Sequence, residues 1–307
     1  MEIALALGGG GIRGLAHVGV IRSLESLGYK IRAIAGTSAG SIVGALYAAS
    51  LTTQDMQAIF NDIVPDRMFA RKIEDGPSLM GLGGMEDLLH QVLGNRTFED
   101  LPFPFATAAV DTASGQEMML HHGNLVQAVL ASSAVPGIFP PRQIGPALLM
   151  DGGVLDPVPV SIARWLAPDL PVVAVVLNQP APDKADTSHP LLPIPIPGPT
   201  QLVEQISRMR LAQAFSVFSR SLEISSLMMT ELRLQIDRPD VIIRPMVTDY
   251  SLLGHYNVDD LVSRGEKAGL EARASLEQAV SWPSALARKL RSTLTPEPEP
   301  VNHDLNA

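Results

Sequence analysis

The first part of the chain alternates short apolar runs with stretches of helical spacing. Residues 3–7 are apolar and lead into four glycines, after which apolar residues recur at helical spacing as far as Gly28. A second apolar run, "IRAIAG", leads to Ser38 and to another helical stretch over residues 39–49. The two strand-to-helix turns lie about thirty residues apart, which is typical of a parallel α/β sheet.

The pattern continues to residue 178. Residues 51–95 read as mostly helical around a loop at 76–84, and residues 103–123 as two strands that turn at Ser114 and Gly115. A short helix is expected at 125–131, then a strand ending in "DGG", a helix at 161–167 and an apolar strand at 171–178. These elements predict an α/β fold, and no internal repeat is found beyond the strand-helix unit.

The character of the chain changes after residue 178. Seven prolines between residues 180 and 200 exclude regular structure and leave a linker, a lid or a surface loop open. A helix over 201–236, a strand over 240–247 and a helix over 258–280 are expected next. We therefore expect one domain over residues 1–290 and a disordered tail over 291–307.

Composition excludes several classes of protein. The net charge of −9 and the absence of a basic stripe argue against a nucleic-acid partner. The absence of cysteine excludes disulfides, thiolate nucleophiles and Cys-based zinc sites, and no metal or cofactor is expected. Apolar runs fall short of the roughly 20 residues that span a bilayer, and no basic leader begins the chain, so we expect a cytoplasmic protein.

One serine stands in a setting that favours nucleophilic chemistry. "GTSAG" fits G-x-S-x-G, with Ser38 between Gly36 and Gly40. In such a turn the serine hydroxyl is lifted clear of the sheet, and its neighbours must be small to avoid collision. The motif occurs often by chance, and an ordinary glycine-bounded turn is the alternative at this point.

A glycine run follows the first expected strand. Gly9, Gly11 and Gly14 fit G-x-G-x-x-G, where consecutive N–H groups can converge on an anion. Dinucleotide binding needs an acidic residue after the second strand, but that strand ends in Gly36, Thr37 and Ser38. An oxyanion hole beside the serine is therefore the better interpretation.

The general base is harder to assign. The order Ser38, Asp151, His255 satisfies an α/β-hydrolase triad nominally, but only one strand precedes the serine, and no histidine lies in a glycine-framed turn. Asp151 stands at a strand end, at the edge where a parallel sheet would present Ser38. A carboxylate with a pKa near 4 is a weak base, so this role requires burial to raise the pKa; a plain Asp-Gly turn is the alternative.

Four motifs together resemble a known family. "ALGGGGIRGLAHVGVI", "GTSAGS", "ASSAVPGIFPP" and "DGG", in this order and spacing, resemble a bacterial patatin-like phospholipase over residues 1–178, with a looser match to about residue 280. The resemblance implies a three-layer α/β/α sandwich with a mainly parallel central sheet. It also implies a serine-aspartate dyad that works without histidine.

The resemblance assigns roles to individual residues. It makes Ser38 the nucleophile, Asp151 the base and Gly9, Gly10 and Gly11 the oxyanion donors. Arg13 would steady the loop or a phosphate, and Pro136, Pro140 and Pro141 would shape the pocket wall. The supporting motif positions are Gly14, Gly36, Gly40, Gly152 and Gly153.

The expected activity is hydrolysis of a carboxylic ester of an acyl lipid through an acyl-enzyme. A low-turnover regulatory or lipid-binding protein and, less favoured, an acyltransferase are the alternatives. "LLPIPIPGP" and the helix around Met228 and Met229 either line a groove or touch a membrane surface, or form an exposed linker and a core helix. The 201–236 helix is also a candidate oligomer contact, and the assembly state leaves no trace in the sequence.

Overall fold

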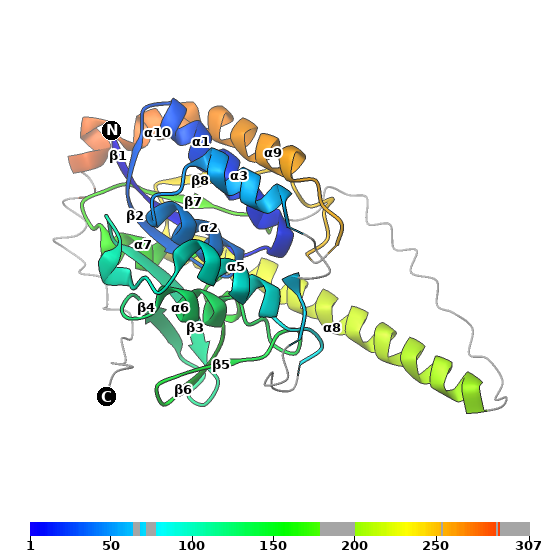
Figure 1. Ribbon diagram of the computed structural model, residues 1–307. Coiled ribbons are helices and arrows are strands. Elements are labelled where there is room, and N and C mark those ends of the chain that lie inside the picture. The colour runs from blue at the N-terminus through cyan, green and yellow to red at the C-terminus, as the bar shows by residue number, and fades with distance from the viewer. Residues whose placement is uncertain (64–67, 72–77, 179–199, 253, 287, 289–307) are drawn as a thin grey trace.

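The computed structural model describes residues 1–63, 68–71, 78–178, 200–252, 254–286 and 288 (Figure 1). The tail expected at 291–307 lies outside these residues, as does the proline-rich segment, except for residue 200, which begins a helix.

An eight-stranded sheet forms the centre of the described chain, in the order β5-β6-β3-β2-β1-β7-β8, with β4 on β3. The run from β3 to β8 is parallel, whereas β4 and β6 pair with β3, and β5 with β6, in antiparallel fashion. The sheet is thus mixed, with a parallel half that carries the first two glycine motifs. The strands are β1 (Glu2–Leu7), β2 (Lys30–Gly36), β3 (Phe105–Asp111), β4 (Glu117–Leu120), β5 (Arg142–Ile144), β6 (Ala147–Asp151), β7 (Val172–Val175) and β8 (Val241–Ile243).

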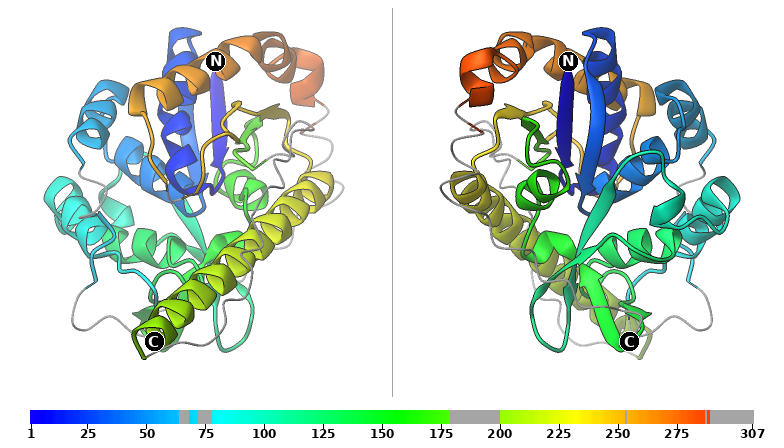
Figure 2. Two further views of the ribbon diagram at one scale, coloured as in Figure 1. Left: turned by 90° about the vertical axis from the view of Figure 1, so that its right-hand side faces the viewer. Right: turned by 90° about the vertical axis from the view of Figure 1, so that its left-hand side faces the viewer.

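Helices cover both faces of the sheet, so the expected α/β/α sandwich is confirmed (Figures 1 and 2). Figure 2 shows α8 running diagonally across one side of the molecule. The α-helices are α1 (Ala16–Ser26), α2 (Ala39–Ala48), α3 (Thr53–Asn61), α5 (Gly83–Leu93), α6 (Leu125–Ser132), α7 (Val160–Leu166), α8 (Thr200–Asp237), α9 (Val258–Glu271) and α10 (Arg273–Ala279). Short 3-10 turns are η1 (Gly11–Leu15), η2 (Phe98–Asp100) and η3 (Gly152–Val154).

The two faces of the sheet differ in side-chain size because successive strand residues point to opposite faces. On β1, the large residues Ile3, Leu5 and Leu7 join the core under α1, α2 and α9. The intervening Ala4 and Ala6 join the core under α7. β2 and β3 repeat the small face with Ala33, Ala35, Ala106 and Ala108, so α7 lies on a surface of methyl groups.

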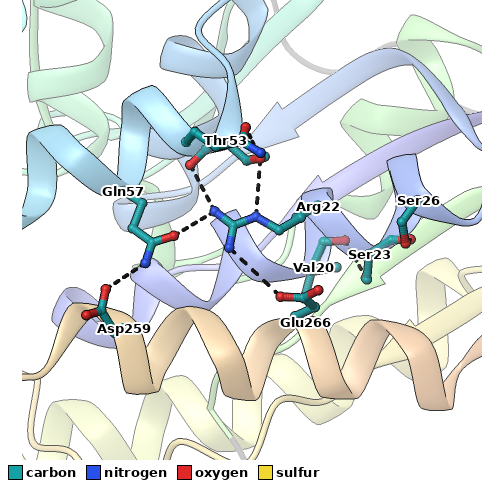
Figure 3. Close-up of polar contacts among 9 residues, drawn as sticks. Val20, Arg22, Ser23, Ser26, Thr53, Gln57, Asp259 and Glu266 are labelled. Carbon is teal, nitrogen blue, oxygen red and sulfur yellow. Dashed lines mark hydrogen bonds and ion pairs between the residues drawn. The ribbon is translucent and has the colours of Figure 1, made fainter.

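A polar cluster joins α1, α3 and α9, which lie on the face of the sheet with the larger side chains. Arg22 of α1 donates to Gln57 Oε1 at 2.6 Å and to the Thr53 carbonyl oxygen at 3.3 Å, and pairs with Glu266 of α9 at 3.9 Å (Figure 3). Gln57 in turn donates to Asp259 Oδ1 at 2.6 Å. This cluster holds α3 and α9 against α1, the helix that follows the first glycine motif.

The structure departs from the expected elements in three places. The helix expected after the glycine run begins as the 3-10 turn η1, and only then continues as α1. β5, a three-residue strand of half-buried and exposed residues, was not expected. The helix expected over 258–280 is divided at Ala272 into α9 and α10, at a point with no glycine or proline to signal an end.

Candidate active site

Ser38 stands in a strained turn between β2 and α2. Its φ of 53° and ψ of −120° place a residue with a Cβ in a region that side chains rarely adopt. The turn is tight because α2 lies close to both β2 and β1: a Cβ on Gly36 would lie 2.6 Å from the Gly40 carbonyl oxygen, and one on Gly40 would meet the Leu7 carbonyl of β1. The local geometry is that of a nucleophile elbow.

Asp151 lies at the end of β6 and is brought to Ser38 by the pairing of β6 with β3. The residue is 4% exposed, and its Oδ1 accepts the Gly153 N–H at 2.7 Å. The Ser38 side chain also hydrogen-bonds to this carboxylate. Burial raises the pKa of Asp151 to about 6, although both hydrogen bonds act to lower it. The two residues that the sequence proposes as a dyad are therefore in contact.

The glycine loop lies beside the serine but differs in one respect from expectation. The Gly9 N–H donates to the Pro157 carbonyl oxygen at 2.9 Å, so it is already engaged. Within the described part of the chain, the N–H groups of Gly10 and Gly11 have no protein acceptor. Both residues line a pocket together with Ser38 and Asp151. The donors open to an oxyanion are thus two of the three expected.

The supporting glycines are positions where a side chain has no room. A Cβ on Gly14 would meet the methyl group of Ala39, the residue after the serine. One on Gly152 would meet the Ala108 carbonyl, and one on Gly153 would lie 3.0 Å from Asp151 Oδ1. Gly14 thus lets the glycine loop approach the elbow closely, and Gly152 lets the "DGG" turn approach β3.

Arg13 is an anchor of the glycine loop. Its Nε donates to the Tyr250 carbonyl oxygen at 2.7 Å, and its Nη2 pairs with Glu223 of α8 at 3.0 Å. The guanidinium is buried, with 6% of the side chain exposed. Of the two roles left open by the sequence, the structure favours that of steadying the loop.

The segment "ASSAVPGIFPP" supplies a contact that the sequence did not assign. Ser132 is fully buried, and its Oγ accepts the Ser38 backbone N–H at 3.0 Å. Val135, Pro136 and Ile138 line the pockets at Ser38, whereas Pro140 and Pro141 line neither of them. The motif as a set marks this segment, but nothing local distinguishes Ser132 from Ser133.

None of the histidines in the described part of the chain lines a pocket at Ser38. His255 is exposed and lines neither pocket at Ser38. His17 is fully buried in α1, and its Nε2 donates to the Gly8 carbonyl oxygen at 2.7 Å, which fixes the tautomer. Burial lowers the pKa of His17 to about 4, so the ring is neutral at physiological pH. The geometry therefore favours Asp151 over His255 as the base.

Ser38 lies where two pockets of different character meet. One, of about 140 Å³, is almost entirely apolar. The other, of about 170 Å³, contains Asp151 and is bounded by a polar side of α8 with Ser219, Glu223 and Ser226. The apolar pocket is lined by side chains from several elements, among them Ile12, Val43, Phe60, Phe69, Met85 and Phe139.

The site contains no arrangement suited to a metal ion: in the described ranges, no three His, Asp or Glu side chains come together in a way that could hold one. In the same ranges, none of the helices is long and apolar enough to cross a bilayer.

Comparison with known sequences identifies the family. The sequence model described as Patatin-like phospholipase matches residues 5–164, more than half of the chain, including Ser38 and Asp151. The chain belongs to the patatin-like phospholipase family.

Several curated proteins resemble this member of the family. An uncharacterized NTE family protein of Mycobacterium tuberculosis is 37% identical over 180 residues, 58% of this chain and 49% of its own. A second one is 30% identical over 281 residues, 90% of this chain and 46% of its own. Patatin-like phospholipase domain-containing protein 6 of Mus musculus is 32% identical over 200 residues, 61% of this chain and 14% of its own. The chain thus spans less than half the length of each of these relatives.

Proposed function

We propose that residues 1–290 form a hydrolase domain that cleaves carboxylic esters of acyl lipids, with Ser38 as nucleophile and Asp151 as general base. The observation that carries this proposal is the hydrogen bond between the Ser38 side chain and a buried carboxylate with a pKa of about 6. A base with this pKa is ionised at neutral pH and can still accept a proton. Membership of the family supports the assignment to lipid esters.

The proposed reaction has two steps. Asp151 accepts the hydroxyl proton as Ser38 Oγ attacks the ester carbonyl carbon, and the N–H groups of Gly10 and Gly11 bind the developing oxyanion. The ester C–O bond then breaks, Asp151 returns the proton to the leaving alcohol, and the acyl group remains on Ser38. Water attacks the acyl-enzyme in the same way, which releases a carboxylic acid and restores the hydroxyl.

The two pockets divide the substrate between them. An acyl chain fits the apolar pocket, because the lining consists mostly of aliphatic and aromatic side chains. The leaving alcohol fits the second pocket, where α8 presents serine hydroxyls. This division gives a lipid ester one orientation across Ser38.

The test is a panel of p-nitrophenyl esters and acyl lipids with wild type, Ser38→Ala, Asp151→Asn and His255→Ala. We expect the first two variants to fall to background and His255→Ala to stay within about twofold of wild type. Ser23→Ala is the control for loss of a serine hydroxyl, because Ser23 is fully buried and donates within α1, to the Val20 carbonyl oxygen, away from the pockets at Ser38. Unchanged hydrolysis by Ser38→Ala would refute the proposal.

The same panel separates the alternatives. A regulatory or lipid-binding protein would show binding of the lipid with no turnover above the Ser38→Ala background. An acyltransferase would move the acyl group to an added alcohol or thiol in preference to water, which product analysis detects.

We further propose that α8 rests on the lipid surface that holds the substrate. Its outward side carries an apolar stripe, which we define as Val217, Ile224, Met228, Leu232 and Ile236, each more than half exposed. The spacing places all five on one side of the helix, and a polar side of α8 lines the pocket at Ser38. A lipid would then pass from that surface into the pocket beside it. One alternative from the sequence placed Met228 in the core, but its side chain is exposed.

The stripe can be tested apart from the chemistry. In the triple variant Ile224→Gln, Met228→Gln, Leu232→Gln we expect hydrolysis of phosphatidylcholine vesicles to fall at least about tenfold and hydrolysis of a soluble short-chain ester to stay unchanged. Trp282→Gln is the control, because Trp282 is 76% exposed and lies outside the stripe. Equal loss on both substrates, or on neither, would refute surface binding through α8.

A further inference from the structure

Two consecutive residues, Asp156 and Pro157, connect the three motifs of the candidate site through their backbone. The Asp156 carbonyl oxygen accepts the Thr37 hydroxyl at 2.9 Å, directly before Ser38 in the chain. The Pro157 carbonyl oxygen accepts the Gly9 N–H at 2.9 Å. The Asp156 N–H donates to the Gly152 carbonyl oxygen at 2.8 Å, directly after Asp151. The backbone of these two residues thus contacts the elbow, the glycine loop and the turn that follows the base.

The side chain of Asp156 links this backbone segment to α8. It is fully buried, and its Oδ2 lies 3.0 Å from Arg233 Nη2. Arg233 also pairs with Asp237 at 3.1 Å and with Glu117 of β4 at 3.5 Å. One arginine thus pairs with three carboxyl groups, none of which lines the pockets at Ser38.

Burial shifts the pKa values of two carboxyl groups in this cluster. Burial and the neighbouring Glu117 raise the pKa of Asp156 well above its usual range, and burial also raises the pKa of Glu117. Both carboxyl groups are thus shifted towards their protonated, uncharged form, and the Arg233 guanidinium acts in the opposite direction by lowering the pKa of Glu117 and of Asp156.

We propose that Asp156 is a positioning residue: anchored to Arg233, it fixes the Asp156–Pro157 backbone against which Ser38, the glycine loop and Asp151 are aligned. The inference rests on the proposed function, because it concerns the geometry of that reaction. Misplacement of reacting groups by about 1 Å can lower a rate about 10²-fold, so a residue that touches no substrate can still control turnover.

The test compares Asp156→Ala, Asp156→Asn and Arg233→Met on a soluble ester. Each kcat is expressed per Ser38 that reacts with a fluorophosphonate titrant, so that unfolded protein is not counted. We expect Asp156→Ala to lower kcat about 10²-fold with KM within about threefold of wild type. Asp156→Asn should stay within about threefold, because the amide has the shape of the carboxyl group and its oxygen can still face Arg233.

Arg233→Met supports the test if Asp156→Ala does not fold, because this arginine is part-exposed, with 22% of its side chain accessible. We expect it to lower kcat about tenfold, and the double variant to be no slower than Asp156→Ala, since both changes act through one contact. Asp240→Ala is the control: Asp240 pairs with Arg288 at 3.3 Å, its side chain is 12% exposed, and it lines neither pocket at Ser38. It should lower thermal stability and leave kcat per titrated serine unchanged.

An unchanged kcat per titrated serine in both Asp156→Ala and Arg233→Met would overturn the inference, because it would leave these residues only a structural role. Failure of the proposed function looks different: wild type and Ser38→Ala would then hydrolyse the ester at the same rate, whatever stands at position 156.

Discussion

The backbone N–H of Ser38 donates to Oγ of Ser132 at 3.0 Å, a contact between residues 94 positions apart in the chain. The peptide group concerned belongs to a residue with a φ of 53°, which the surrounding structure must hold in place. Ser132 is fully buried at the end of α6, so its hydroxyl is held in a fixed position next to this N–H. The hydroxyl of one serine thus holds the backbone of another.

Ser132→Ala should therefore reduce both stability and turnover. A buried N–H without an acceptor costs about 1–3 kcal/mol of unfolding free energy, and a loosened elbow should lower kcat about tenfold. Thermal unfolding and ester hydrolysis measure the two effects, with Ser23→Ala as the buried-serine control. A Ser132→Ala variant that is as stable and as active as the control would contradict this account.

Asp151→Asn should stabilise the protein while removing activity. The pKa of Asp151 is about 6 in the folded chain and 3.8 as the reference, so the folded state holds more protons between these pH values. The unfolding free energy contributed by this group therefore falls as pH rises from about 4 to about 6, and stays low above that. At pH 7 the buried charge costs up to about 3 kcal/mol, which the amide avoids.

Chemical denaturation at pH 7 and at pH 4 measures this effect. The stability gain of Asp151→Asn should be present at pH 7 and nearly absent at pH 4. Asp55→Asn should instead lower the unfolding free energy at pH 7, because hydrogen bonds from Thr52 lower the pKa of Asp55 in its capping box. Stabilisation of Asp151→Asn that is equal at both pH values would count against a buried, ionised base.

Hydrolysis should lose rate on the acid side with an apparent pKa near 6. The base acts only when ionised, so kcat/KM for an uncharged ester should fall about tenfold per pH unit below that value. His17, with its pKa of about 4, does not titrate in this range. A profile that stays flat down to pH 5 would exclude Asp151 as the base.

Val43→Phe should change the preference for acyl length. Val43 of α2 is buried in the wall of the apolar pocket, a little over one helical turn beyond Ser38. A phenyl ring there occupies space that a long acyl chain needs, so kcat/KM for a dodecanoyl ester should fall at least about tenfold, while an acetyl ester changes less than about threefold. An equal loss for both esters would indicate that the pocket does not hold the acyl chain.

The parts of the site that are local in sequence could be predicted from it. Gly36 indicates the elbow because the collision it avoids is local, with the backbone of Gly40 and Ser41. The collision that Gly40 avoids is with the Leu7 carbonyl of β1, and the G-x-S-x-G pattern alone does not show that contact. The position of Asp151 at the end of its strand follows from the apolar run before it. The direction of that strand relative to its neighbours could not be predicted, because an apolar run does not show which way the strand runs in the sheet. β6 is antiparallel to β3.

The parts that depend on distant contacts could not be predicted. The engagement of Gly9 by Pro157 and the bond from Thr37 to Asp156 join residues more than a hundred positions apart, and no periodicity reports such pairs. Asp156 looks in sequence like any aspartate before a proline. Only its complete burial beside Arg233 distinguishes it.

The methyl-lined face of the sheet has a consequence for the chemistry. Ala4, Ala6 and their neighbours on β2 and β3 let α7 lie close to the strands, and α7 begins three residues after Pro157. Val158, between them, packs in the same cluster, 3.0 Å from where a Cβ on Gly8 would be. A bulkier residue on that face would lift α7 and draw the Pro157 carbonyl away from the glycine loop. The thickness of this apolar layer thus helps to set how closely the Pro157 carbonyl approaches the glycine loop.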